Sequence, residues 1–362
     1  MLKNFKINLT LAALIFVTLF VTDSYSQTTK VLFIGSSLTG FNGQPVIFNE
    51  LATAAGKEVL VVNGARAGHN LTDHLSVPET VEKINQEKWD YVVLENGDYG
   101  LMYEETRAEV WTTIGTFINM IHANCSTTKI IIFMDWAMKY GVSHNGMYYS
   151  YEIFQQMIYN ATMDVARDKN LIVAPIGSAW RSIVNTFPGI ELYAPDNGHP
   201  SLGGSYLGAC VYYSVIFQES VVGNNYFNTI PETEAQNIQS VASSTVLENL
   251  GLWNIVTSVD LEDKDYSKNF SFHLFQNFPN PFNPSTTISF ELIGYCNAEL
   301  LIYNSVGERI YSFLHGETLS PGLYSFSWNG KNDSGNQVGA GTYFYSFRTG
   351  NFVVTKGMIL LK

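Results

Sequence analysis

The sequence is poor in charged residues and especially in basic ones. Only 14% of its 362 residues are charged, and 20 Lys and Arg stand against 32 Asp and Glu, which gives a net charge of −12. Such a chain repels phosphate backbones and anionic lipids, so we expect no nucleic acid partner. Hydrophobic residues make up 46% of the chain, which excludes a disordered protein and supplies a large core.

Cysteine is also scarce. Cys125, Cys210 and Cys296 are odd in number and far apart, so they form neither a disulfide framework nor a metal-ligand cluster. We expect buried free thiols. No group of His and carboxylate residues has metal-binding spacing either, and we expect neither a metal nor a cofactor.

Long apolar runs are missing apart from one near the N-terminus. Lys3 and Lys6 precede an apolar stretch over 9–21, which is followed by small residues up to Ser26. This order is typical of a secretory signal peptide, here residues 1–26. A membrane anchor is the alternative, but the run is shorter than the ~18 to 20 apolar residues of a spanning helix. We expect no transmembrane segment in the mature chain.

Residues 27–255 alternate short β-branched runs with helical patterns. The expected strands are 31–35, 58–63, 91–95, 129–134 and 171–175, and the expected helices are 45–55, 147–168, 202–217 and 234–249, with a further apolar helical stripe over 110–121. Such alternation produces right-handed crossovers and a parallel sheet covered on both faces. The sequence predicts a three-layer α/β/α domain with a five-stranded parallel sheet, whose ligand site lies beyond the carboxyl ends of the strands.

The pattern changes after a polar, acidic stretch that we assign to a linker, residues 256–271. Residues 272–362 show no helical pattern, and their alternating runs are separated by turn signals such as Asn332-Asp333-Ser334-Gly335. Seven or so short strands in about ninety residues predict an immunoglobulin-like β-sandwich.

Three loops at the carboxyl edge of the expected sheet carry candidate chemistry. Ser37 lies in Gly35-Ser36-Ser37-Leu38-Thr39 directly after the first strand, where a serine is exposed beside the amides of a helix start. Asp196 and His199 share one short loop, so they can supply a base and the acceptor that orients it. Gly68 follows the second strand and can offer its backbone amide to an oxyanion. Each element alone is also compatible with an ordinary turn or helix cap.

Together the three loops resemble the SGNH or GDSL hydrolase superfamily over residues 30 to 250. The resemblance implies a triad of Ser37, Asp196 and His199, and an oxyanion hole from the amides of Ser37 and Gly68. Two positions depart from the family pattern: Ser36 replaces the usual Asp, and the block after the third strand lacks the Gly-x-Asn spacing. Asn96 is the best candidate for the third oxyanion donor.

The C-terminal region has a second resemblance. The segment from Phe275 to Ile288, Gly339-Ala340-Gly341-Thr342-Tyr343 and the final residues 356–362 resemble the type A sorting domain of the type IX secretion system. This implies export through the periplasm and outer membrane, with residues 272–362 as the part that the secretion machinery recognises. An immunoglobulin-like spacer or a carbohydrate-binding module is the alternative.

These observations predict a secreted or cell-surface serine esterase that acts on an acylated small molecule or glycan. Tyr99, Tyr103, Trp136, Tyr140 and His144 are expected near the mouth of the site, and Trp136 is a candidate for substrate contact, although aromatic residues more often serve packing. A catalytically weak surface glycan-binding protein or adhesin that retains the fold is the alternative.

Overall fold

A computed structural model describes residues 28–97, 99–255, 272–277, 279–292, 296–319, 322–349 and 352–361. The expected signal peptide (1–26) and linker (256–271) lie outside the described residues.

The first unit is built on a five-stranded parallel sheet. Its strands lie in the order β2-β1-β3-β4-β7, with bounds β1 (Thr29–Ile34), β2 (Val59–Asn63), β3 (Tyr91–Leu94), β4 (Lys129–Phe133) and β7 (Ile172–Ala174). All five are at the expected positions. Strand order reverses at β1, which has β2 on one side and β3 on the other, and sheets of this type bind ligands at that point.

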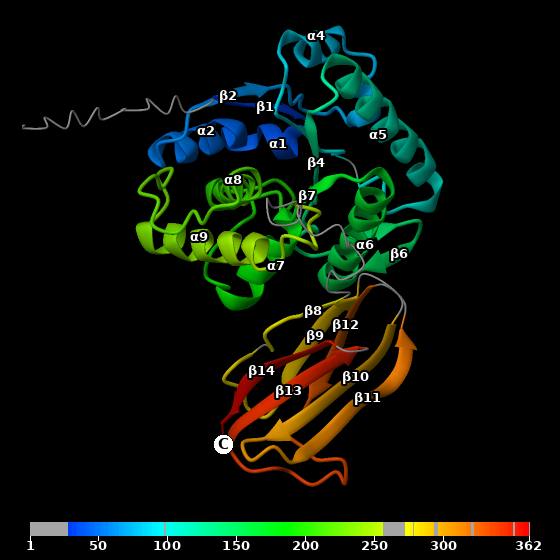
Figure 1. Cartoon of the computed structure of the whole chain (residues 1–362), viewed down its shortest axis with the longest axis vertical. Coiled ribbons are helices and arrows are strands. Elements are labelled where there is room, and N and C mark those ends of the chain that lie inside the picture. Colours follow the sequence, from blue (N-terminus) through cyan, green and yellow to red (C-terminus); the bar gives the residue numbers. More distant parts are fainter. Residues whose placement is uncertain are drawn as a thin grey trace, which may run out of the picture.

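Helices cover both faces of this sheet (Figure 1). On one face lie α2 (Gln44–Ala54) and α8 (Leu202–Phe217), backed by α7 (Ile176–Thr186) and α9 (Glu232–Leu247); the other carries α4 (Pro78–Gln86), α5 (Glu104–Asn124) and α6 (Tyr151–Lys169). The expected three-layer α/β/α arrangement is confirmed.

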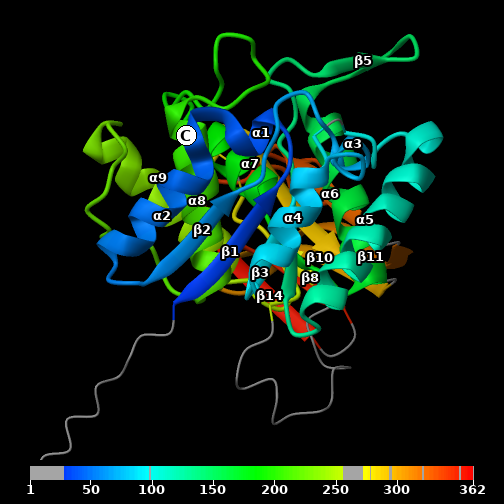
Figure 2. The ribbon, with the colours of Figure 1, turned by 90° about the horizontal axis from the view of Figure 1, so that it is seen from above.

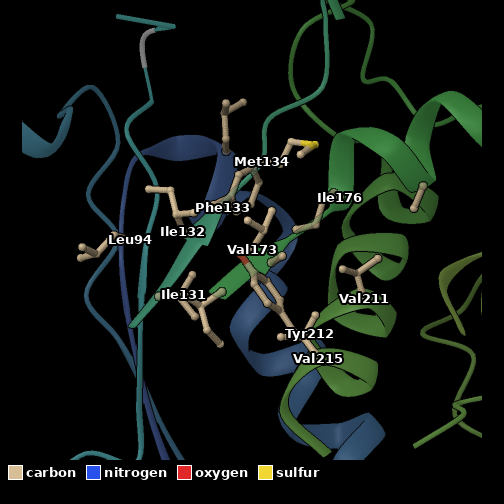
Figure 3. Packing of buried hydrophobic residues seen from close by; sticks show 14 of the residues in the cluster. Leu94, Ile131, Ile132, Phe133, Met134, Val173, Ile176, Val211, Tyr212 and Val215 are labelled. Atoms are coloured by element: carbon tan, nitrogen blue, oxygen red, sulfur yellow. The ribbon is translucent and has the colours of Figure 1, made fainter. Parts of the chain in front are cut away.

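Helix α8 forms the centre of this core. It is apolar on all sides and buried along almost its whole length, as expected for a helix enclosed by other elements. Tyr212 and Val215 face the side chains of β4 and β7 (Figure 3). Burying an aliphatic side chain of this size contributes roughly 1.5 to 3 kcal/mol. The helix begins at the cap Ser201, whose hydroxyl accepts a hydrogen bond from the Gly204 amide at 3.1 Å.

One expected helix is shorter than predicted. Helix α6 begins at Tyr151 instead of residue 147, because residues 142–149 form a hairpin of β5 (Val142–His144) and β6 (Met147–Tyr149). Its turn is Asn145-Gly146, with φ of 49° and 77°, and this dipeptide favours two-residue hairpin turns. The hairpin projects from the carboxyl edge of the sheet (Figure 2).

The second unit is an antiparallel β-sandwich. One sheet has the order β11 (Arg309–Leu319), β10 (Cys296–Asn304), β13 (Gly341–Thr349) and β14 (Phe352–Leu360); the other has β12 (Gly322–Trp328), β9 (Thr286–Leu292) and β8 (Phe272–Leu274). Its buried cluster, which includes Ile288, Leu300 and Phe347, is separate from the core of the α/β unit. The expected sandwich is confirmed.

The described residues contain free thiols at Cys125, Cys210 and Cys296, of which Cys210 is buried and the other two are partly exposed. None of the helices in the described ranges combines the length and apolar character needed to cross a membrane.

Candidate active site

Ser37 is the first residue of a one-turn helix, α1 (Ser37–Gly40), that follows β1 after two residues. The preceding residue, Ser36, caps this turn, and its side chain accepts a hydrogen bond from the Leu38 amide at 3.1 Å. The Ser37 side chain is partly exposed, and its Oγ lies 2.8 Å from Nε2 of His199. The structure therefore brings together two predicted site residues that are 162 positions apart in the sequence.

The loop from Asp196 to Pro200 holds the candidate base, His199, and the carboxylate expected to orient it, Asp196. Asp196 Oδ2 lies 2.5 Å from His199 Nδ1, while Oδ1 accepts hydrogen bonds from the amides of Gly198 and His199 at 3.0 and 2.9 Å. Asn197 adopts φ 63°, a left-handed conformation that asparagine tolerates better than most residues. The loop thereby turns tightly enough for Asp196 to reach both its own backbone and the imidazole.

The hydrogen bonds from Gly198 and His199 lower the pKa of Asp196 to about 2. The carboxylate is consequently ionised at any pH above that value. An ionised carboxylate at Nδ1 fixes the tautomer that leaves Nε2 free to accept a proton from Ser37.

Phe41 and Asn42 follow the turn that carries Ser37 (residues 36–40, the nucleophile turn), and they contact the His199 ring and the His199 loop, respectively. The Phe41 ring stacks on His199 with centroids 4.8 Å apart, and Asn42 Nδ2 donates to the Pro200 carbonyl at 2.9 Å. The His199 side chain is nevertheless 33% exposed. The imidazole is held in place by its neighbours and is still accessible to a ligand from solvent.

Trp136 does not lie where substrate contact was expected. Its side chain is 0% exposed, it stacks on Trp180 with ring centroids 4.1 Å apart, and its Nε1 donates to the Gly198 carbonyl at 2.9 Å. A fully buried indole offers no surface to a ligand. Trp136 instead supports the loop that carries Asp196 and His199.

The three expected oxyanion donors lie at the ends of three adjacent strands. Ser37 follows β1, Gly68 lies in the loop after β2, and Asn96 comes two residues after the end of β3. The β2 loop is tied to the nucleophile turn because the Arg66 amide donates to the Gly35 carbonyl at 2.8 Å. Gly68 has φ 74°, which favours glycine. Asn96 is 5% exposed, so its amide group lies under the surface near this edge.

The other aromatic residues expected near the site have different environments. Tyr103 stacks on His144 with centroids 3.6 Å apart, and Nε2 of that histidine lies 2.5 Å from Glu105. The Tyr99 hydroxyl donates to the Trp136 carbonyl at 3.2 Å. Tyr140, in contrast, is 68% exposed. Of these four side chains, Tyr140 is the most available to a ligand.

Glu95 lies directly beneath the nucleophile turn and was not among the predicted site residues. It is 0% exposed and accepts hydrogen bonds from the Ser36 amide, the Ser36 hydroxyl and the Thr39 hydroxyl at 2.7, 2.8 and 3.0 Å. A carboxylate directly after a buried strand was the available signal, since such a group requires partners.

Among the described residues, no cluster of three or more His, Cys, Asp or Glu side chains is arranged to hold a metal ion. The chemistry that this arrangement supports is nucleophilic attack by an activated serine with a positioned general base.

Comparison with known proteins agrees with this architecture. A DUF4886 family protein from Bacteroides uniformis is 20% identical, with a TM-score of 0.51, over 61% of this chain and 95% of its own. An acetyl xylan esterase from Geobacillus stearothermophilus is 20% identical over 51% and 93%, with a TM-score of 0.40. A protein assigned to the SGNH hydrolases from Slackia heliotrinireducens is 26% identical over 51% and 97%, with a TM-score of 0.42.

Residues 285–350 match the FlgD Ig-like domain family. No curated protein sequence was found to be related to the chain. The α/β unit therefore shares the fold of the DUF4886 family protein, and an Ig-like domain follows it.

Proposed function

We propose that the protein is a serine esterase that hydrolyses carboxylic esters through an acyl-enzyme. The observation that carries this proposal is the continuous chain of contacts from Ser37 Oγ through the His199 imidazole to the Asp196 carboxylate. An alcohol becomes an effective nucleophile when an oriented base removes its proton, and this chain supplies both the base and its orientation.

The reaction proceeds in two steps. His199 Nε2 takes the Ser37 proton while the serine oxygen attacks the ester carbonyl, and the amides of Ser37 and Gly68 with the Asn96 side chain stabilise the oxyanion. His199 then protonates the departing alcohol. In the second step His199 takes a proton from a water molecule, whose oxygen attacks the acyl carbonyl, and His199 returns that proton to Ser37 Oγ as the acid leaves.

Turnover of a short-chain p-nitrophenyl ester by the purified protein tests the proposal. A serine-directed phosphonate should label Ser37 alone. A protein that neither hydrolyses such esters nor reacts with the phosphonate would instead be a glycan-binding protein or an adhesin, the alternative function for this fold.

We further propose that the acyl group is carried by a glycan. Tyr140 and Tyr148 are 68% and 65% exposed, and the Tyr148 hydroxyl donates to the Tyr140 carbonyl at 2.6 Å. The Lys139 amide, next to Tyr140, donates to the Asn197 carbonyl of the catalytic loop at 3.0 Å. Two amphipathic rings beside this loop suit a sugar ring, which offers both apolar and polar surface. Comparing acetylated polysaccharides with lipid esters as substrates distinguishes this class from acyl-chain substrates.

Asn96 is proposed as the third oxyanion donor, and removing its side-chain amide tests that role. Asn96→Ala is expected to lower kcat ~10²- to 10³-fold, with a much smaller effect on KM, because the hydrogen bond forms only in the transition state. Steady-state kinetics on the short-chain ester measure this change.

Asn70 provides the matched control. Its side chain caps helix α3 (Leu71–His74) by accepting a hydrogen bond from the Asp73 amide at 2.9 Å. Asn70→Ala should therefore cost about 1 kcal/mol of stability and leave kcat unchanged. A large loss of kcat in Asn70→Ala with none in Asn96→Ala would show that Asn70, and not Asn96, is the third donor. No loss of kcat in either variant would show that the oxyanion hole consists of backbone amides alone.

We also propose that the C-terminal domain directs export to the cell surface through a type IX secretion system. The proposal is supported by the resemblance of residues 275–288 and 356–362 to type A sorting domains and by the separate core of this unit. The N-terminal segment 1–26 would supply the signal for export into the periplasm, which precedes passage through the outer membrane.

Truncating the chain after Asn269 tests this division of roles. The α/β unit keeps its own core and all three triad residues, so the truncated protein should stay folded and hydrolyse esters at the full rate. The Arg181 guanidinium lies 5.8 Å from the Phe275 ring, and losing this contact would cost only roughly 0.5 to 1 kcal/mol. Secretion in the native host should be lost. A folded but inactive truncated protein would show that the β-domain contributes to the site.

A further inference from the structure

The Glu95 carboxylate is buried, and it contacts both ends of the nucleophile turn. The amide of Ser36 and the hydroxyls of Ser36 and Thr39 all donate to it, at 2.7 to 3.0 Å. These two residues flank Ser37 and Leu38 in the sequence. Burial raises the pKa of Glu95, whereas the hydrogen bonds from Ser36 and Thr39 oppose that shift. A buried ionisable group is costly without such partners, so this arrangement needs an explanation.

Two glycines leave the space for this close approach. A Cβ atom on Gly35 would lie 2.7 Å from Glu95 Oε2, and one on Gly97 would lie 2.6 Å from the Ser36 Cβ. Gly97 also has φ 86°, which disfavours other residues. The end of β3 is thus packed directly against the start of α1, with the Glu95 carboxylate between them.

We infer that Glu95 is the positioning residue of the nucleophile. By fixing the backbone on both sides of Ser37, it sets the direction of the Ser37 amide and keeps Oγ 2.8 Å from His199 Nε2. The Ser36 hydroxyl extends this effect, since it accepts from the Leu38 amide and donates to Glu95. The inference rests on the proposed esterase function. It also accounts for the position of Ser36, where a short hydroxyl bridges the helix start to a carboxylate supplied by the neighbouring strand.

Kinetics of Glu95→Ala and Glu95→Gln test the inference. Displacements of about 1 Å in a reacting group can cost ~10²-fold in rate, so Glu95→Ala is expected to lower kcat by 10- to 100-fold, with KM changed by less than about two-fold. Glu95→Gln should restore most of this loss. Its amide oxygen can still accept from the Ser36 amide and Thr39, and its amide nitrogen can donate to the Ser36 hydroxyl.

A second substitution separates positioning from general support of the fold. Ser36→Asp placed in the Glu95→Ala protein returns a carboxylate and a good helix cap to the same space, and it is expected to recover part of kcat. Ser36→Asp with Glu95 present puts two carboxylates in one buried site, so it should be less active than both the wild-type protein and the double variant Ser36→Asp/Glu95→Ala. The rate of phosphonate labelling at Ser37 should follow kcat through the whole series. Melting temperatures show whether each variant is folded at the assay temperature.

A folded Glu95→Ala protein with the wild-type kcat would overturn the inference while leaving the esterase function intact. So would labelling that falls only in proportion to the unfolded fraction. If Glu95→Ala does not fold, Glu95→Asp and Ser36→Ala replace it, and a wild-type kcat in both overturns the inference. A wild-type protein that neither hydrolyses esters nor is labelled overturns both proposals.

Discussion

Replacing Ser37 with alanine is expected to lower kcat for a short-chain ester by roughly 10⁴- to 10⁶-fold. The substitution removes the oxygen that lies 2.8 Å from His199 Nε2 and that would form the acyl-enzyme. The fold should be unaffected, because the helix cap at this turn belongs to Ser36 and the Ser37 side chain is partly exposed. Ester turnover and the far-UV circular dichroism spectrum measure the two effects.

Ser36 is the internal control for this prediction. Its hydroxyl is buried and lies 2.8 Å from Glu95, so it cannot reach a substrate. Mass spectrometry of the phosphonate-treated protein should find the adduct on Ser37 and none on Ser36. An adduct on Ser36, or full activity in Ser37→Ala, would rule out the triad.

His199→Ala should cause a loss of similar size, since Ser37 would have no base. Asp196→Asn should retain some activity, because this carboxylate orients the imidazole and supports its charge without taking part in bond formation. The acid side of the pH–rate profile adds a further check. Because the pKa of Asp196 is about 2, loss of activity within about pH 5 to 8 would not come from protonation of this carboxylate.

Steady-state rates of both variants and a pH–rate profile of the wild-type protein measure these effects. A profile that stays flat down to about pH 5, or a His199→Ala variant with substantial turnover, would contradict general-base catalysis by this residue.

Much of the fold could be predicted because its signals are local. The five strands of the sheet are short runs of β-branched and aliphatic residues, and α8 is an apolar segment that begins just after Ser201. The start of α6 was misplaced because the residues from Met147 to Tyr149 continue its apolar pattern although they belong to a hairpin. The Asn145-Gly146 turn was the signal against a helix there.

The site was predictable where its groups lie in short loops with a local signature. Ser37 and the pair Asp196 and His199 stand in short loops whose glycine and proline content suggests a fixed conformation, and the structure brings them into contact. The supporting contacts were not predictable. Glu95 meets Ser36 across neighbouring strands, and Trp136 meets Gly198 from a separate loop, so neither contact has a signature in sequence spacing.

The parallel indoles of Trp136 and Trp180 give this protein an optical reporter of its own. Their planes are inclined by only 7°, and two aromatic chromophores so close couple their electronic transitions. One of the pair is hydrogen-bonded to Gly198, between the two triad residues of that loop. A near-ultraviolet circular dichroism signal from this pair should therefore register any rearrangement of the His199 loop when a ligand binds, without an added label.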